Sequence, residues 1–333
     1  MLSRKIDLSG RLRALPICLL ISALFGCGSE STVQPAAAPG WVSQQSGTRA
    51  QLWGVHFVDA STGTVVGIDG TILRTVDGGL NWQAQDSGTR SDLVGVYFTD
   101  SNTGTVVGGD FTSIVILHTT DGGATWNEQL REEVAQIYLR SVSFADAQNG
   151  FAVGDFGTIR HTSDGGATWT AQRTDSYPAL LGVFCIDANT ATAVGNSSAI
   201  FHTVDGGATW LQQTVPGSPV MLFDVHFADR NTGTVVGRSG RILHTTDSGA
   251  NWTLQDSGLL TDFRSVSFVG TDVGVVVGGI RILRTTDGGV RWARQSGDSA
   301  GYFGYFGVWF ADADHGTVVG DDGTILHTTT GGR

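Results

Sequence analysis

Six aspartates recur at nearly even spacing, and they are the residues of this 333-residue chain best suited to acid or base chemistry. A pair of aspartates can supply the acid and the base of a glycosidase. Each one stands in a segment of the form T-x-D-G-G-x-x-W, with serine for the first glycine after Asp247, so all six occupy equivalent places. Six equivalent copies cannot all be catalytic, and the repetition favours a structural role. The six are Asp77, Asp121, Asp164, Asp205, Asp247 and Asp287.

A hairpin turn accounts for this segment without any chemistry. The aspartate carboxylate is expected to accept backbone N–H bonds while the two glycines adopt positive φ, and the tryptophan then packs over the turn. Successive tryptophans lie 40 to 44 residues apart, which is the period of a four-stranded propeller blade. These tryptophans are Trp82, Trp126, Trp169, Trp210, Trp252 and Trp292, with Trp41 one period before the first.

The segments between the glycines are short, rich in β-branched residues and free of proline, which predicts strands. In the first full repeat we expect strands at 53–58, 62–67, 71–75 and 81–85. A seventh box, TTTGGR at 328–333, lacks its tryptophan. The sequence therefore predicts an all-β, seven-bladed propeller of four-stranded antiparallel blades over residues 41–333, closed by the N-terminal strand.

Histidine and cysteine offer other chemistry. Five histidines precede the boxes, but equivalent strands of adjacent blades should lie on the order of 10 Å or more apart, too far to share one metal ion. We predict no metal and no cofactor, and assign the histidines to structure or surface contacts. Cys185 stands where other repeats carry phenylalanine, so it should be a small buried residue. The histidines are His118, His161, His202, His244 and His327.

The N-terminus has the pattern of an export signal. Residues 1–26 combine a basic start with a short apolar run, and the run ends at Gly26-Cys27, which resembles a lipobox. We expect Cys27 to be lipidated and residues 27–40 to form a flexible tether; an ordinary signal peptide cut nearby is the alternative. The formal net charge of −11 argues against nucleic acid as a partner. The prediction is a monomer in the cell envelope, periplasmic or on the outer membrane, held to the membrane through the lipid alone.

The repeated segment resembles the Asp-box, or BNR repeat, of sialidases, sortilin-type receptors and xyloglucan hydrolases. The spacing, the Val-Val-Gly strand and the I-L-H/R-T-T-D-G-G run look most like the photosystem II stability and assembly factor family. The resemblance covers about residues 41–333. It implies a non-enzymatic scaffold that holds a membrane or exported protein during assembly.

Departures from the pattern bear on function. Ser248 replaces a box glycine and Thr330 replaces a box aspartate, and arginine precedes the box only at Arg74 and Arg284. Because unperturbed histidine is mostly uncharged near neutral pH, a basic patch of the family would be weakened here. The Arg-Ile-Pro motif and the tyrosine–glutamate pair of sialidases are not evident. We therefore predict no catalytic residues, with a glycan-binding or glycoside-hydrolase-like module as the alternative.

The face opposite the Asp-boxes is the expected binding face, because loops between blades and the turns after Val-Val-Gly gather there. The turns carry Asp69, Asp110, Phe111, Asp155, Phe156, Asp321 and Asp322. The loop 297–310 adds Tyr302, Phe303, Tyr305 and Phe306. Exposed aromatic rings rimmed by carboxylates would suit a peptide or a glycan. Packing of these rings between blades remains an equal alternative.

Overall fold

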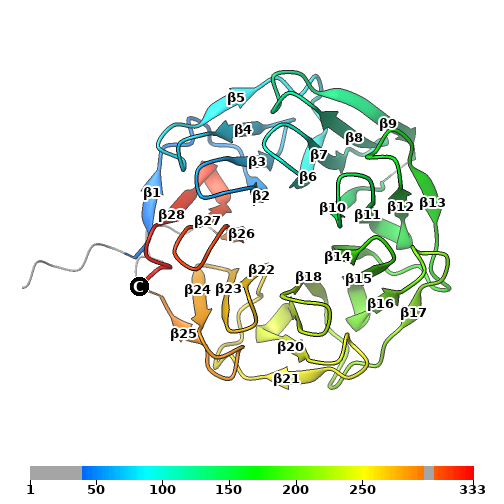
Figure 1. Cartoon of the computed structure of the whole chain (residues 1–333), viewed down its shortest axis with the longest axis vertical. Helices are drawn as coiled ribbons and strands as arrows, with labels where there is room; N and C mark the ends of the chain where they lie inside the picture. The colour runs from blue at the N-terminus through cyan, green and yellow to red at the C-terminus, as the bar shows by residue number, and fades with distance from the viewer. Residues whose placement is uncertain (1–39, 135, 296–303) are drawn as a thin grey trace, which may run out of the picture. The chain divides into compact units, whose positions relative to one another are not determined.

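Seven four-stranded antiparallel sheets surround a central axis in the computed structural model, which describes residues 40–134, 136–295 and 304–333 (Figure 1). In six of the sheets the strands follow one another in sequence from the axis outwards. The seventh combines the last three strands with the first strand of the chain. The predicted seven-bladed fold is confirmed.

Blades 1 to 3 have the following strands. Blade 1 contains β2 (Leu52–Phe57), β3 (Gly63–Gly67), β4 (Ile72–Thr75) and β5 (Gln83–Gln85). Blade 2 contains β6 (Asp92–Phe98), β7 (Gly104–Gly109), β8 (Ser113–Thr119) and β9 (Asn127–Glu133). Blade 3 contains β10 (Leu139–Phe144), β11 (Gly150–Gly154), β12 (Ile159–Thr162) and β13 (Thr170–Gln172).

The remaining blades repeat the plan. Blade 4 contains β14 (Leu180–Asp187), β15 (Thr190–Gly195), β16 (Ile200–Thr203) and β17 (Leu211–Gln212). Blade 5 contains β18 (Leu222–Phe227), β19 (Gly233–Gly237), β20 (Ile242–Thr245) and β21 (Thr253–Gln255). Blade 6 contains β22 (Ser265–Val269), β23 (Val273–Gly278), β24 (Arg281–Thr285) and β25 (Ala293–Arg294). Blade 7 contains β26 (Tyr305–Phe310), β27 (Gly316–Gly320) and β28 (Ile325–Thr328). Four short 3₁₀ turns follow second strands: η1 (Asp155–Gly157), η2 (Asn196–Ser198), η3 (Arg238–Gly240) and η4 (Asp321–Gly323).

The N-terminal strand closes the ring as predicted. β1 (Val42–Gln44) pairs with β28 in antiparallel register, Val42 opposite His327 and Gln44 opposite Ile325 (Figure 1). Trp41 is buried in the cluster that contains Phe310 and Leu326. Gly40, expected at the end of the tether, packs against Gly332. The two ends of the propeller are thus joined by hydrogen bonds and by a shared core.

A β-bulge opens the inner strand of most blades. In β2 the register shifts between Leu52 and Gly54, and five other blades show the same shift. The bulge explains why the apolar residues follow the spacing L-x-x-V-x-F rather than strict alternation. Leu52, Val55 and Phe57 consequently share one core cluster with residues of blade 7.

The Asp-box turns have the geometry expected of a staple. In the first box, Asp77 accepts bonds from the Asn81 backbone N–H at 2.9 Å and from the Thr75 hydroxyl at 2.8 Å, and the Thr75 oxygen accepts the Gly79 N–H at 2.8 Å. Gly79 has φ of 85°, and a Cβ there would lie 2.1 Å from the Gln44 side chain. Side-chain and backbone hydrogen bonds lower the pKa of the Asp121 and Asp164 carboxyls to about 2.

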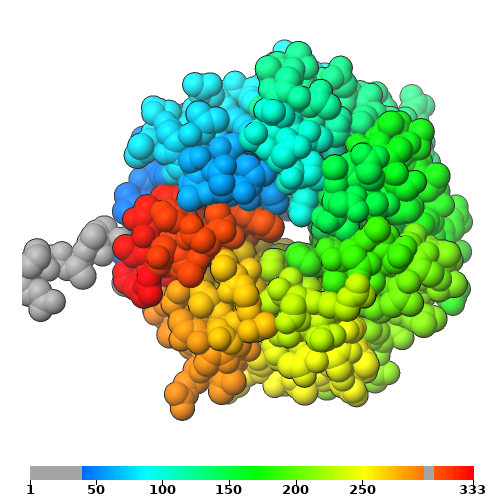
Figure 2. Space-filling model, viewed as in Figure 1, coloured from blue at the N-terminus to red at the C-terminus, as the bar shows by residue number. Residues whose placement is uncertain are grey.

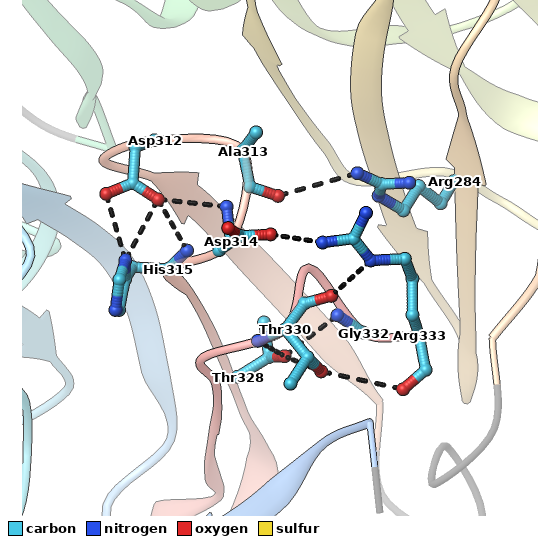
Figure 3. A network of polar contacts seen from close by, with 9 residues as sticks. All are labelled: Arg284, Asp312, Ala313, Asp314, His315, Thr328, Thr330, Gly332 and Arg333. Carbon is cyan, nitrogen blue, oxygen red and sulfur yellow. Dashed lines mark hydrogen bonds and ion pairs between the residues drawn. The ribbon is translucent and has the colours of Figure 1, made fainter.

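The seventh turn keeps its shape without the aspartate (Figure 3). Thr328 still accepts the N–H groups of Thr330 and Gly332, at 3.2 and 2.8 Å. Arg333 donates to the Thr330 carbonyl at 2.8 Å and pairs with Asp314, while Arg284 reaches the Ala313 carbonyl at 3.4 Å. Arginine contacts therefore tie this turn to its neighbours in place of the missing carboxylate.

Candidate functional site

The two faces of the ring differ in what they carry. Each inner strand begins beside the turn after Val-Val-Gly, as shown by the bond from Ile68 N–H to the Gln51 carbonyl at 3.0 Å. Each inner strand ends at the Asp-box side, where Gly78 N–H bonds the Ser61 carbonyl at 2.8 Å. We call the first side, formed by the inter-blade loops and the turns after Val-Val-Gly, the mouth face.

The carboxylates predicted for the binding face all lie in mouth-face turns, but several have local partners. Asp110 accepts bonds from Ser91, Thr112 and Ser113, and side-chain hydrogen bonds hold the pKa of its carboxyl well below the usual range. Asp321 accepts the Gly304 N–H at 2.9 Å and a bond from Gln51. Asp69 and Asp322 adopt left-handed backbone, with φ of 54° and 51°.

Of the four aromatic residues predicted in the loop 297–310, the structure describes two, and these differ in their environments. Tyr302 and Phe303 lie outside the described residues. Tyr305 is 4% exposed and belongs to the core cluster of Trp41 and Phe310, so for this ring the alternative of packing between blades holds and the exposed binding role does not. The reason is positional: Tyr305 stands three residues before Val308, in the place that Leu52 holds before Val55. Phe306 stacks on Trp53 with ring centroids 5.4 Å apart.

Four aromatic residues form a strip across blades 2 to 4 of the mouth face. Phe111 meets Tyr138 edge to face at 6.5 Å, and the Arg140 guanidinium lies 4.7 Å over the Tyr138 ring. Arg140 forms a two-pronged ion pair with Asp155, at 3.1 and 2.8 Å, and Phe156 follows Asp155 directly. Tyr177 lies with its backbone against Gly157. We call Phe111, Tyr138, Phe156 and Tyr177 the aromatic strip.

Phe156 is the most unusual member of the aromatic strip. It has φ of 54° and is 61% exposed, whereas the equivalent left-handed positions carry aspartate or serine in Asp69, Ser197, Ser239 and Asp322. A bulky residue in this backbone region is strained, and such strain gathers at functional sites. Phe111 and Tyr177 are 75% and 64% exposed. The sequence prediction included Phe111 and Phe156 but missed the two tyrosines.

The mouth face opens into a central chamber of about 450 Å³. The space-filling view shows an opening at the centre of the ring (Figure 2). Its rim is a ring of seven residues, one from each blade, at the position two before the valine of the L-x-x-V-x-F pattern. In the bulged blades this is the extra, unpaired residue, which the bulge turns towards the axis. We call this ring the gate: Trp53, Val94, Arg140, Leu181, Phe223, Arg264 and Phe306.

Aromatic and imidazole side chains narrow the chamber at the end away from the gate. His56 lies between Tyr97 and Trp309, at 4.4 and 4.2 Å, and His226 lies 4.7 Å from Phe184 and 6.2 Å from Trp309. Burial lowers the pKa of His56 to about 3, with a smaller contribution from Arg74, and lowers that of His226 to about 4. These imidazoles are therefore neutral at ordinary pH.

The sequence analysis named one gate residue, Phe306, but predicted neither the gate as a ring nor the narrowing of the chamber, because their members occupy the variable positions of the repeat. The sequence does contain a signal for both features: at two positions of the inner strand, five of the seven repeats carry a large ring or an arginine, where the rest of the repeat is regular.

Asp224 contributes a carboxylate to the chamber wall. It accepts bonds from the backbone N–H groups of Val225 and Val266 at 2.9 and 3.0 Å, and from the Ser265 hydroxyl at 2.9 Å. Loss of solvent raises the pKa of this carboxyl to about 6, against the effect of those bonds. The described residues contain no group of three His, Cys, Asp or Glu side chains placed to hold a metal ion.

The five histidines before the boxes lie in third strands and are half-buried. Four of them approach a second-strand threonine, as His202 does Thr192 at 2.9 Å, while His161 stacks on Phe151 at 4.5 Å. Desolvation lowers the pKa of all five. Cys185 is buried, and burial raises the pKa of its thiol to about 12, which fits the predicted packing role.

The closed ring of Asp-box blades, with a gated chamber on the opposite face, defines an Asp-box propeller. Residues 80–218 and 210–300 match the family described as photosynthesis system II assembly factor YCF48, and the chain belongs to this family. No curated protein sequence matches the chain significantly.

Solved structures agree with the family in fold. The structure titled "YCF48 bound to D1 peptide" has a TM-score of 0.73 and 21% identity, over 90% of this chain and 99% of that one. YCF48 from Cyanidioschyzon merolae has a TM-score of 0.69 and 21% identity, over 87% and 98%. A GH74 enzyme of Niastella koreensis has a TM-score of 0.68 and 14% identity, over 86% of this chain and 53% of the enzyme.

Proposed function

We propose that this chain is an exported, membrane-anchored scaffold without catalytic activity, and that it holds a membrane or exported protein on its mouth face. Family membership supports the assembly-factor role, and one solved YCF48 structure is titled as bound to a peptide. The observation that supports a binding site on the mouth face is the aromatic strip. There the strained and exposed Phe156 replaces the aspartate or serine of other blades. Exposed aromatic anchors are typical of protein-binding surfaces.

The carboxylates support a binding role rather than hydrolysis. A glycosidase needs one carboxyl as acid and another as base or nucleophile, free to reach the substrate. On the chamber side, Asp155 is paired with Arg140, and Asp224 is occupied by three hydrogen bonds. The Asp-box carboxylates are likewise engaged in their turns.

A glycan-binding or glycan-cleaving module is the second candidate, because a GH74 enzyme shares the fold and the gate presents aromatic rings to the chamber. The two candidates differ in the molecule that the mouth face retains. A capture experiment from detergent-solubilised membranes separates them when variants of the strip are compared with variants of the opposite face.

The test variant is Phe111→Ser with Phe156→Ser, serine being the residue of blades 4 and 5 at the turn. The matched control is Leu80→Ser with Val290→Ser, which removes two apolar side chains, 82% and 76% exposed, from Asp-box turns. We expect a captured protein to be lost with the strip variant and kept with the control. Retained polysaccharide without protein, or equal capture by both variants, would overturn the proposal.

Anchoring through Cys27 is a separate part of the proposal, supported by the signal-like sequence that precedes it. In the part of the chain that the structure describes, no helix has the length and apolar character to cross a membrane. Fractionation of cells that express Cys27→Ala should move the protein from the membrane to the soluble fraction. Metabolic labelling with palmitate should mark the wild type and not the variant; labelling of both would reject lipidation at Cys27.

A further inference from the structure

The gate carries two arginines that differ in their ion-pair partners. Of its two arginines, Arg140 is neutralised by the ion pair with Asp155. Arg264 is exposed, and its guanidinium lies 4.2 Å over the Phe223 ring. Among the described residues, no carboxylate pairs with Arg264. An arginine stacked on an aromatic ring keeps its N–H donors available in the ring plane for a carboxylate.

The gate also offers an apolar surface next to that charge. The stacked rings of Trp53 and Phe306 come from blades 1 and 7, and Leu181 and Val94 complete the rim. A ligand bound at Arg264 would therefore contact rings and aliphatic side chains with the rest of its body.

Below the gate the chamber is uncharged apart from Asp224 and has polar groups without partners. The Nδ1 atoms of His56 and His226 and the indole Nε1 of Trp309 are buried and have no hydrogen-bond partner among the described residues. His226 is neutral and faces the same space as Trp309. The cavity volume of about 450 Å³ falls within the range of small-molecule sites, roughly 300–1,000 Å³.

We propose that the central chamber binds a ligand that joins a carboxylate to an aromatic or aliphatic body, with the carboxylate at Arg264 and the body between Trp53, Phe306 and the chamber wall. This ligand class has two sources, a free organic acid or the terminal carboxylate of a peptide. The site is distinct from the aromatic strip and does not depend on the proposed protein partner.

Calorimetric titration of the full chain tests the proposal with four probes. They are 3-phenylpropionate, its primary amide, a tetrapeptide that ends in phenylalanine with a free carboxylate, and the same tetrapeptide amidated. We expect at least one carboxylate to bind and its amide to bind about tenfold more weakly or worse, since charge-assisted bonds to arginine are the stronger kind. Binding of phenylpropionate favours a free acid, and binding of the peptide alone favours a chain terminus.

Two variants locate the binding. Arg264→Gln should weaken the carboxylate about tenfold and leave the amide unchanged. Arg291→Gln makes the same charge change beside the Asp287 box on the other face, and it should have no effect. The proposal is overturned if neither carboxylate binds, if amides bind as well as acids, or if Arg264→Gln and Arg291→Gln behave alike. Thermal melts of both variants verify that each is folded.

Discussion

At the scale of single residues, Asp224 occupies a position that other blades fill with glycine or serine. Gly54 and Gly182 let the inner strand approach the next blade, where a Cβ would lie 2.7 and 2.9 Å from backbone atoms. Ser141 and Ser265 instead accept the backbone N–H of the following blade, at 3.3 and 3.2 Å. Asp224 does the same with a carboxylate, so blade 5 joins blade 6 through a group that titrates.

The pKa of Asp224 gives this contact a pH dependence. Its folded pKa of about 6 exceeds the ordinary value of 3.8, so its contribution to stability is full below 3.8 and is lost as pH rises through about 6. Asp224→Ser removes that loss. Relative to the wild type, the variant should therefore gain free energy of unfolding as pH rises from 4 to 7. Urea unfolding at several pH values in that range measures the difference, and a difference that does not vary with pH would contradict this expectation.

Blade 4 fills its core with a different set of side chains, because Cys185 stands where the other blades have phenylalanine. In six blades a glycine lies under the inner-strand phenylalanine, and a Cβ on Gly63 would come within 2.4 Å of the Phe57 ring. Blade 4 has Ala191 opposite Cys185 instead. Because blade 4 has no phenylalanine at position 185, its box tryptophan Trp210 instead packs edge to face with Phe151 of blade 3, with ring centroids 5.4 Å apart.

Restoring the phenylalanine alone should therefore overpack the site. Cys185→Phe is expected to cost about 1–3 kcal/mol of unfolding free energy. The triple variant Cys185→Phe, Ala191→Gly and Phe151→Thr recreates the arrangement of blade 1 and should recover most of that loss. Chemical unfolding of the single and triple variants decides the matter; equal destabilisation would mean that the three positions are not coupled.

At the scale of elements, the repeat predicted the strands closely, because each is bounded by glycines and has its own apolar pattern. The strands expected at 62–67 and 71–75 are observed at Gly63–Gly67 and Ile72–Thr75. The bulge and the gate were not predicted, since the extra residue occupies a position where any side chain is tolerated by the sheet. The sequence left Tyr305 between exposure and packing for a related reason: its neighbours in a glycine-rich loop obscured its alignment with the buried leucines.

A glutamine clasp joins four of the blades to the next, and it explains the glutamine that follows the box tryptophan. Gln172 donates to the Gly206 carbonyl at 3.0 Å and accepts the indole N–H of Trp210 at 3.3 Å. The same pair of bonds is made by Gln44, Gln85 and Gln255 to the following blades. The outer strands are short, so this clasp supplies specific contacts where the apolar core ends.

Removal of one clasp should be costly because its partners are shielded from water. Gln172→Ala leaves the Trp210 indole and the Gly206 carbonyl unpaired, at a cost of about 1–3 kcal/mol. Gln212→Ala is the control, since Gln212 is exposed on the next outer strand, and it should change stability by less than about 0.5 kcal/mol. Matching unfolding midpoints for the two variants would show that the clasp carries no stability.

At the scale of the whole molecule, the sequence predicted architecture far better than function. The period and the displaced Trp41 determined the number of blades and the closing strand, because a repeat must bury both of its faces. The proposed binding surfaces depend on residues that break the repeat. Phe156 was named from the sequence because it follows a turn aspartate, whereas no pattern in a single sequence separates Arg264 from tolerated variation. The structure brings such residues to one face and makes them comparable with their equivalents.

Ring closure is the step on which cooperativity of the propeller depends. β1 supplies the outer strand of blade 7, Trp41 fills the core beside Phe310 at 5.8 Å, and Gln44 clasps Trp82 of blade 1. Deleting residues 40–45 removes all three contacts and exposes the edge of β28, which invites pairing with other chains.

Loss of the buried tryptophan alone is worth about 3–5 kcal/mol. We expect the deletion variant to unfold at lower urea and to form concentration-dependent oligomers in size-exclusion chromatography. Trp82→Ala, which removes one indole but keeps every strand, should lower stability and remain monomeric. A deletion variant that stays monomeric and unfolds at the wild-type midpoint would show that six complete blades and an open seventh suffice.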